Sequence, residues 1–227
     1  MARINMLLTA LGMLSSVAFA DGLTVKPEII GSQSKFDFDK IESVNLTTGR
    51  RYTSKPQGKS ETISGLGGGV AIEFGLNDLV SIGGGVSYLN YPEKDDNAEF
   101  GDLNAKGYAT YSFYKQAGFD AYGLGGLSIH QLSVDDSSEK LSATESVSNE
   151  ADPVTLANYD LGVGTNYKVS DSVAIGLKYS FSDSFWSQDL KSQSTSRLDE
   201  GTEVDKATTK GLSMQSHSLT LSASLSL

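Results

Sequence analysis

The chain has 227 residues and carries 28 acidic side chains against 18 Lys and Arg, which gives a formal net charge of −10. Because proteins bind nucleic acid largely through Lys and Arg on phosphates, this charge excludes a nucleic-acid partner. Cysteine is absent, which excludes disulfides, thiolate metal sites and cysteine nucleophiles.

The first twenty residues have the features of a cleavable signal peptide. Arg3 is the only early charge, an apolar stretch spans 4–14, and Ala-Phe-Ala at 18–20 matches the small-x-small pattern of a signal-peptidase site. The apolar stretch is too short for a membrane-spanning helix. We therefore expect a signal peptide over 1–20 and an exported domain over 21–227, whose net charge becomes −11 once Arg3 is removed.

Apolar and small polar residues alternate along the exported domain. Because side chains on a strand alternate between two faces, this pattern predicts strands over 60–74, 79–90, 100–114, 154–167, 172–182 and 211–227. A weaker strand is expected over 23–38, with a change of parity near Ile30. Another is expected over 119–132, which is apolar on both parities, so its facing stays open. Together these make eight strands.

The connections between the predicted strands alternate in length. Short connections of tight-turn length read GLND, KQAG and KVSDS, and long polar ones span 39–60, 90–99, 133–152 and 183–207. This alternation is typical of bacterial outer-membrane barrels, with short periplasmic turns, longer external loops, an even strand number and both termini periplasmic. We predict an all-β, eight-stranded antiparallel up-and-down transmembrane β-barrel in the outer membrane.

Aromatic residues gather near both ends of the predicted strands, and we expect them to form the two interfacial girdles of a membrane barrel. Those next to the short turns are Phe74, Tyr111, Phe113, Tyr114, Phe119, Tyr122 and Tyr167. Those next to the long connections are Tyr88, Tyr91, Phe100, Phe181, Phe185 and Trp186. The alternative is a soluble lipocalin-like barrel. The polar face, mostly Gly, Ser and Asn, is too small to cover a water-facing surface, which favours the membrane barrel.

The last ten residues, SLTLSASLSL, alternate strictly. We expect Leu219, Leu221, Leu225 and Leu227 to face lipid and the serines to face the lumen. This strand should pair with the first strand and close the barrel, because an open edge in lipid would leave backbone N–H and C=O groups unpaired.

The strand texts GLGGGVAIEF, SIGGGVSYLNY and LGVGTNYKV, with the alternating connections, resemble the small OmpA/OmpX-type outer-membrane β-barrel families over almost the whole exported domain. The resemblance implies outer-membrane lipids and lipopolysaccharide as surroundings. It also implies the barrel-assembly machinery as a partner during biogenesis. That machinery reads a terminal strand that usually ends in an aromatic residue, whereas this chain ends in Leu227.

Several charged side chains are expected on the lumen face of the predicted strands. They are Glu61, Glu73, Asp102, Lys106, Asp160 and Lys178. Charges in a narrow interior are tolerated when they are paired or hydrated, and the side chains of an eight-stranded barrel just fill its interior. This predicts an internal polar plug, with a narrow conducting path as the alternative.

The chain carries few groups suited to catalysis. His130 and His217 are its two histidines, and both are expected at the outer rim. A lipid-modifying site would need His, Ser and a carboxylate together, but Ser216 and Ser218 flank His217 on a strand and point to the other face. GLGGG at 65–69 lies inside a strand and lacks the following Gly-Lys of a phosphate loop. We expect no catalytic, cofactor or metal site.

The long connections differ in charge. The segment 39–60 has five Lys and Arg and two acids, whereas the other three together carry sixteen acids and five bases. We predict a non-enzymatic protein that serves membrane integrity and surface interaction through its external loops, with a surface ligand that is unknown. A narrow pore for small solutes is the alternative, and a lipid-modifying enzyme is a weaker one.

Overall fold

The computed structural model describes residues 22–54, 60–92, 99–134, 137–140, 146–198 and 201–227. The predicted signal peptide over 1–20 lies outside these residues. Within the described ranges, no helix is long and apolar enough to cross a membrane.

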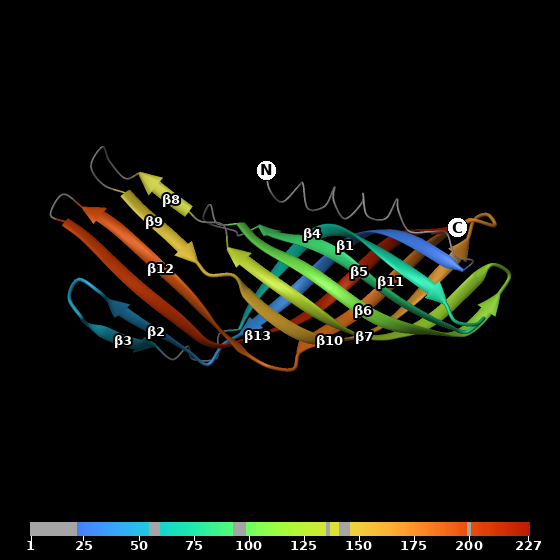
Figure 1. Cartoon of the computed structure of the whole chain (residues 1–227), viewed down its shortest axis with the longest axis horizontal. Helices are drawn as coiled ribbons and strands as arrows, with labels where there is room; N and C mark the ends of the chain where they lie inside the picture. The colour runs from blue at the N-terminus through green and yellow to red at the C-terminus, as the bar shows by residue number, and fades with distance from the viewer. Residues whose placement is uncertain (1–21, 55–59, 93–98, 135–136, 141–145, 199–200) are drawn as a thin grey trace.

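A ring of antiparallel strands forms the body of the molecule (Figure 1). In order around the ring the strands are β1 (Leu23–Asp37), β4 (Glu61–Gly75), β5 (Val80–Pro92), β6 (Glu99–Gln116), β7 (Phe119–Val134), β10 (Val154–Lys168), β11 (Val173–Ser184) and β13 (Gly201–Ser226). Seven of the predicted ranges match a ring strand to within two residues at each end, whereas the predicted range 211–227 matches only the later part of β13. The first and last strands pair from Thr24–Ser226 to Asp37–Ser213, which closes the ring.

Short turns join the ring strands at one end of the barrel. Between β4 and β5, the Asn77 side chain accepts hydrogen bonds from the backbone N–H groups of Leu79 and Val80. Between β6 and β7, Ala117 and Gly118 both have positive φ, as a tight hairpin whose twist matches its strands requires. These local bonds explain why such short connections suffice.

Three of the long connections contribute strands to a second sheet, which we call the loop sheet. Its strands are β2 (Lys40–Asn45), β3 (Arg51–Ser54), β8 (Ser137–Lys140), β9 (Ser146–Ala151), β12 (Gln188–Leu198) and the part of β13 before Gly211, in the order β3-β2-β13-β12-β9-β8. Figure 1 shows it projecting beyond the end of the barrel opposite the turns. The described part of the chain therefore holds 13 strands: the eight of the ring, and five more within segments that were expected to be connections without strands.

A bulge marks the passage of β13 from the barrel to the loop sheet. Gly211 has φ +69, and the register with β12 shifts between Gln188 and Leu190. A glycine in this conformation adds one residue to the strand and changes which alternate residues share a face. Below the bulge Leu212 is buried in the interior, and above it Lys210 lies on the outward side.

The first strand keeps one facing along its length, so the change of parity expected near Ile30 is wrong. Ile30 and Phe36 are buried inside the barrel together with Lys26 and Glu28. In the sequence, Ile30 and Phe36 look like lipid-facing residues because they are apolar. They face inward because the end of the interior next to the loop sheet is itself apolar. The open facing of 119–132 is also settled, since His130 is buried inside.

That apolar end of the interior is filled by side chains that we call the apolar plug. Its buried members are Phe36, Leu132, Val154, Leu156, Leu212 and Met214 in one cluster and Ile30, Leu89 and Tyr91 in another. Ile63 and Phe100 pack against both clusters, and Leu190 of the loop sheet packs against the first. Burying side chains of this size stabilises by about 1.5–3 kcal/mol each.

Three aromatic residues expected at the membrane interfaces lie inside the barrel instead, namely Tyr91, Phe100 and Tyr122. Tyr91 is buried, and its hydroxyl shares a hydrogen bond of 2.9 Å with the Ser34 hydroxyl. Its ring packs on Phe100, with the ring centroids 5.6 Å apart. Tyr122 is buried near the turn end. Large rings fit inside because small residues face them, as at Gly65 opposite Tyr91 and Gly164 opposite Tyr122.

Candidate functional site

A buried carboxylate holds two lysines at the centre of the lumen. The Lys106 ammonium lies 2.6 Å from Glu28 Oε2, and the Lys178 ammonium lies 2.9 Å from Glu28 Oε1. All three side chains are largely shielded from solvent. Lys106 and Lys178 were expected in the lumen, whereas Glu28 was missed because the alternation around it in β1 is loose.

A second ion pair lies nearer the turns. The Lys26 ammonium is 2.5 Å from Glu73 Oε2, and the Tyr108 hydroxyl donates to Glu73 Oε1 at 3.0 Å. Lys26 also lies over the ring of Tyr122 at 5.8 Å. Buried charges of this kind persist only when partners offset their desolvation, so the pairs account for how the lumen tolerates them.

A third polar group lies nearer the plug. His130 Nδ1 is 2.8 Å from Asp102 Oδ2, and His130 Nε2 is 3.1 Å from the Ser128 hydroxyl and 2.9 Å from Asn104 Nδ2. His130 and Asp102 are buried, so the expectation of a histidine at the outer rim is wrong for His130. The sequence did not reveal its inward orientation, because the range 119–132 is apolar on both of its faces.

A polar cavity of about 50 Å³ lies between the ion pairs and the plug. Its lining includes Ile30 and Leu89 from the plug, Lys106 and Lys178 from the ion pairs, and Asp160, with hydroxyls from Ser180, Ser182, Ser216, Ser218 and Thr220. Among the described residues, Asp160 Oδ2 and Asn104 Oδ1 are buried without a hydrogen-bond partner. A cavity of this size and polarity has room for a few waters, which would satisfy them. The side chain of Glu61 lies outside the described residues.

Ser128, His130 and Asp102 have the contacts of a serine-hydrolase triad, but the site lacks what acyl transfer needs. Their side chains are buried at 3%, 3% and 0% exposure, beneath the plug. Their backbones belong to the β6–β7 ladder, so their N–H groups point along the wall and form no oxyanion hole. The three side chains therefore satisfy one another. The other histidine, His217, is exposed on the outer face, with Nδ1 2.6 Å from the Tyr179 hydroxyl.

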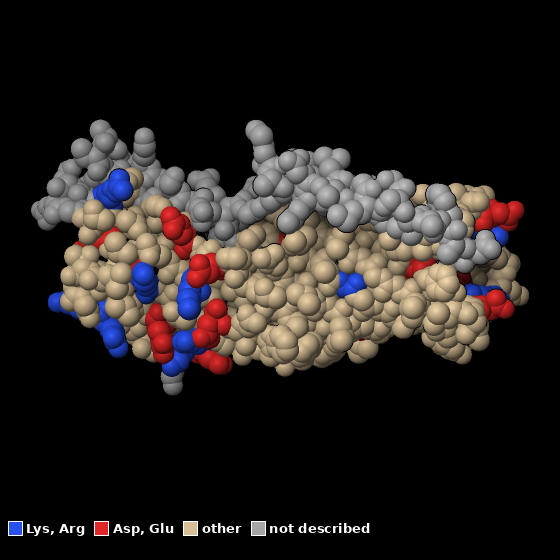
Figure 2. Space-filling view, viewed as in Figure 1, with Lys and Arg blue, Asp and Glu red and all other residues tan. Residues whose placement is uncertain are grey.

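The outer face of the barrel is apolar. Residues exposed there include Phe74, Tyr111, Phe113, Tyr167, Ile129, Leu161, Leu177, Leu219, Leu221, Leu225 and Leu227. Trp186 is exposed just beyond β11, while Tyr88 and Phe181 are partly covered on the same outer side. Figure 2 shows the visible wall almost free of charge, with charged side chains gathered on the loop sheet and at the turns.

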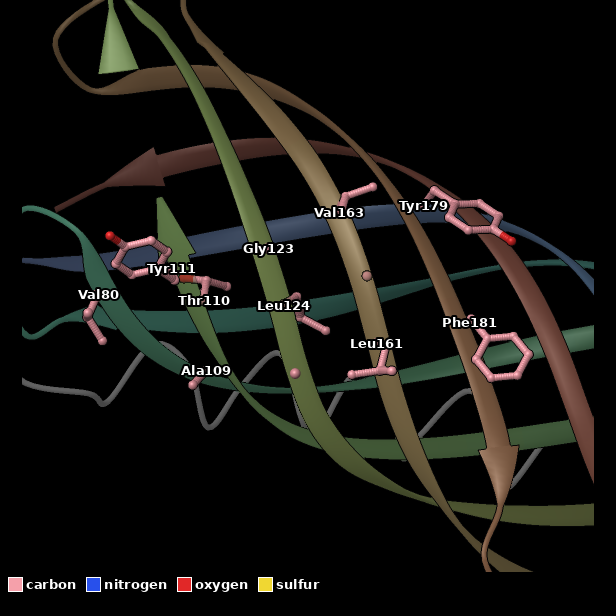
Figure 3. A pocket seen from close by; sticks show the side chains of 12 residues that line it. Val80, Ala109, Thr110, Tyr111, Gly123, Leu124, Leu161, Val163, Tyr179 and Phe181 are labelled. Carbon is pink, nitrogen blue, oxygen red and sulfur yellow. The ribbon is translucent and has the colours of Figure 1, made fainter. Parts of the chain in front are cut away.

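A shallow groove of about 690 Å³ crosses this outer face over β6, β7, β10 and β11. Figure 3 shows Tyr111, Leu161, Val163 and Phe181 around a floor at Gly123 that carries no side chain. The groove is open and apolar, as expected of a wall that contacts lipid chains.

The family model for the outer membrane protein β-barrel domain matches residues 6–222. No curated protein sequence matches the chain. Among solved structures, Neisserial surface protein A is similar at 14% identity and a TM-score of 0.51, over 91% of this chain and 98% of that one. OprG from Pseudomonas aeruginosa (15%, TM-score 0.41, 90% and 97%) and Ail of Yersinia pestis (12%, TM-score 0.39, 91% and 100%) are more distant.

Identities this low show the fold alone, whereas the family model covers most of the chain. The buried lumen, the apolar wall and this match agree with one another. The chain belongs to the outer-membrane β-barrel family of the OmpA/OmpX type, whose members lie in the outer membrane of Gram-negative bacteria.

Proposed function

We propose that this protein is a non-enzymatic barrel whose eight ring strands span the outer membrane, whose lumen is closed, and whose loop sheet serves surface interaction. The observation that carries the proposal is the filling of the lumen by two different layers in series. The Lys26–Glu73 and Lys106–Glu28–Lys178 contacts occupy one half, and the apolar plug occupies the other. Such a barrel contributes to the integrity of the membrane without making it permeable to solutes.

The two layers oppose conduction for different reasons. An ion entering the charged layer must compete with bonds of 2.5–2.9 Å that are already satisfied. An ion entering the plug must shed its water, as at the hydrophobic constrictions that close channels. Because the layers lie in series, opening one leaves the other in place.

Planar-bilayer recording tests the closed lumen. We expect the folded wild-type protein to give no resolved conductance steps. Phe36→Ala with Met214→Ala, which shortens two plug residues that pair across β1 and β13, should stay closed because the charged layer remains. Adding Lys106→Ala and Lys178→Ala should open a small pore that prefers cations, because the carboxylates stay. Heat-modifiable gel mobility checks folding of each variant, and large steady wild-type openings would contradict the closed lumen.

The narrow pore remains the second candidate function. The polar cavity favours it, since it leaves space that water can enter. A lipid-modifying enzyme is the weakest candidate. Its only support is the Ser128–His130–Asp102 contact set, which lies buried below the plug where a lipid substrate has no room.

The proposal places the loop sheet outside the cell and both termini in the periplasm, with insertion by the barrel-assembly machinery through β13. Because the chain has no cysteine, single cysteines report the topology cleanly. Thr47→Cys, in the turn between β2 and β3, should react with a membrane-impermeant maleimide on intact cells. Asp171→Cys, fully exposed in the turn before β11, should react only after the outer membrane is opened. The reverse pattern would invert the topology.

A further inference from the structure

The two faces of the loop sheet differ in charge. Residues paired across antiparallel strands share a face, so the pairings place Arg51, Val44, Lys206, Gln193 and Glu150 in one row on one side. Leu190, on the opposite parity of β12, packs inward against the plug. The row with Lys206 therefore faces outward, on the same side as the lipid-facing wall.

Every Lys and Arg with a described side chain on these strands falls on that outward face. The six are Lys40, Arg51, Lys191, Arg197, Lys206 and Lys210, which we call the basic face. Glu203 and Asp205 carry the opposite charge, and their pairings with Ser196 and Ser194 place them on the inward side. The segregation follows from period-two spacing of the cations along β12 and β13.

The acids on the outward face are mostly occupied. Lys40 lies 2.5 Å from Glu42, and Lys210 lies 2.5 Å from Asp189. The hydrogen bond from Lys210 lowers the pKa of the Asp189 carboxyl. Four cations have no carboxylate within ion-pair distance among the described residues, and all four are exposed: Arg51, Lys191, Arg197 and Lys206.

The basic face continues the lipid-facing wall upward along one strand. Leu221 and Leu219 of β13 lie on the apolar wall, His217 follows beside Tyr179, and Lys210 and Lys206 come above the bulge. The same side of the strand thus passes from lipid chains to an interfacial ring and then to ammonium groups. In the orientation proposed above, molecules of the surrounding outer leaflet would extend past the wall to this level.

We propose that the basic face binds the phosphate groups of lipopolysaccharide in the outer leaflet around the barrel. Lipopolysaccharide carries phosphates on lipid A and on its inner core, just above its acyl chains. Lysine and arginine are the side chains that hold phosphate. The rest of this acidic chain, with a net charge of −10 overall, would repel such groups. The assignment rests on the proposed function, because it needs the loop sheet on the outer side.

A binding titration on the folded exported domain tests the assignment. Fluorescent lipopolysaccharide in zwitterionic detergent micelles is titrated with wild type, with Lys191→Gln plus Lys206→Gln, and with Lys115→Gln plus Lys168→Gln as the matched control. The control pair removes two exposed lysines near the turns. One basic residue near an anionic surface contributes about a factor of five, so we expect the first variant to bind roughly 30-fold more weakly. The control should bind like wild type.

A second arm identifies the phosphate as the bound group. Lipopolysaccharide stripped of phosphate should bind wild type and the basic-face variant equally weakly, and added salt should reduce the difference between them. Equal binding of the two forms by wild type, or no loss in the basic-face variant, would overturn the assignment. So would tighter binding of heparin than of lipopolysaccharide, because that points to a soluble polyanion. The assay in micelles does not depend on topology, so its failure is distinct from a failure of cysteine labelling or conductance.

Discussion

Leu177→Arg should lower the free energy of unfolding in bilayers by about 2–4 kcal/mol, the cost of a cation at the midplane on the lipid face of a barrel. Leu177 lies in the middle of β11, half exposed on the outer wall, and pairs with Thr165 and Leu221. An arginine there has no lumen to enter and no partner in lipid. Denaturant titration of the folded protein in vesicles measures the change.

Val169→Arg is the matched control for depth. Val169 is exposed in the turn between β10 and β11, so the same aliphatic-to-arginine change there should cost at most about 1 kcal/mol. If the two variants lose the same stability, the outer face of β11 does not lie in hydrocarbon.

Glu28→Gln should be the most damaging conservative change in the lumen, lowering the free energy of unfolding by about 3–5 kcal/mol. Glu28 is 6% exposed and binds both Lys106 and Lys178. Glutamine keeps the shape but removes the charge, which leaves two ammonium groups side by side without a counter-ion. The same denaturant titration in vesicles measures this loss.

Glu42→Gln is the matched control for burial. Glu42 also binds a lysine, Lys40 at 2.5 Å, but it lies exposed on the loop sheet. Water screens such a pair and contributes most of the solvation of both groups, so its loss should leave stability within experimental error. A Glu28 variant as stable as the Glu42 variant would show that the lumen is open to bulk water. Adding Lys106→Met and Lys178→Met to Glu28→Met should recover stability, because no unpaired charge then remains.

The wall of the barrel follows directly from the sequence. Period-two alternation identifies a strand such as 172–182 from its own residues, without reference to the strands that it pairs with. The residues Ile175, Leu177 and Tyr179, which the alternation assigns to the outer face, are exposed in the structure. The alternating short and long connections add the up-and-down order. Both signals are local in the sequence, so they can be read without knowing which strands are neighbours in the sheet.

The strands of the loop sheet could not be predicted in the same way. Strand β12 reads QDLKSQSTSRL, with polar residues on both parities, so it lacks the apolar stripe that identifies a membrane strand. Its pairing with β13 and β9 supplies the stabilisation instead, and that pairing exists only once the barrel has brought the strands side by side. A polar connection and a polar strand therefore look alike until the neighbouring strand is known.

The contents of the lumen were likewise predictable only in part from the sequence. The sequence alone determines that Asp102, Lys106, Asp160 and Lys178 share the face opposite the lipid stripe. It does not determine that Lys106 and Lys178 meet at Glu28, because β6, β11 and β1 come together only through ring closure and register. Period two also cannot tell an apolar stripe facing lipid from one facing a filled interior. Tyr91, Phe36 and Met214 form part of the plug because ring closure brings their strands around a space that such side chains just fill, and only the tertiary structure sets that space.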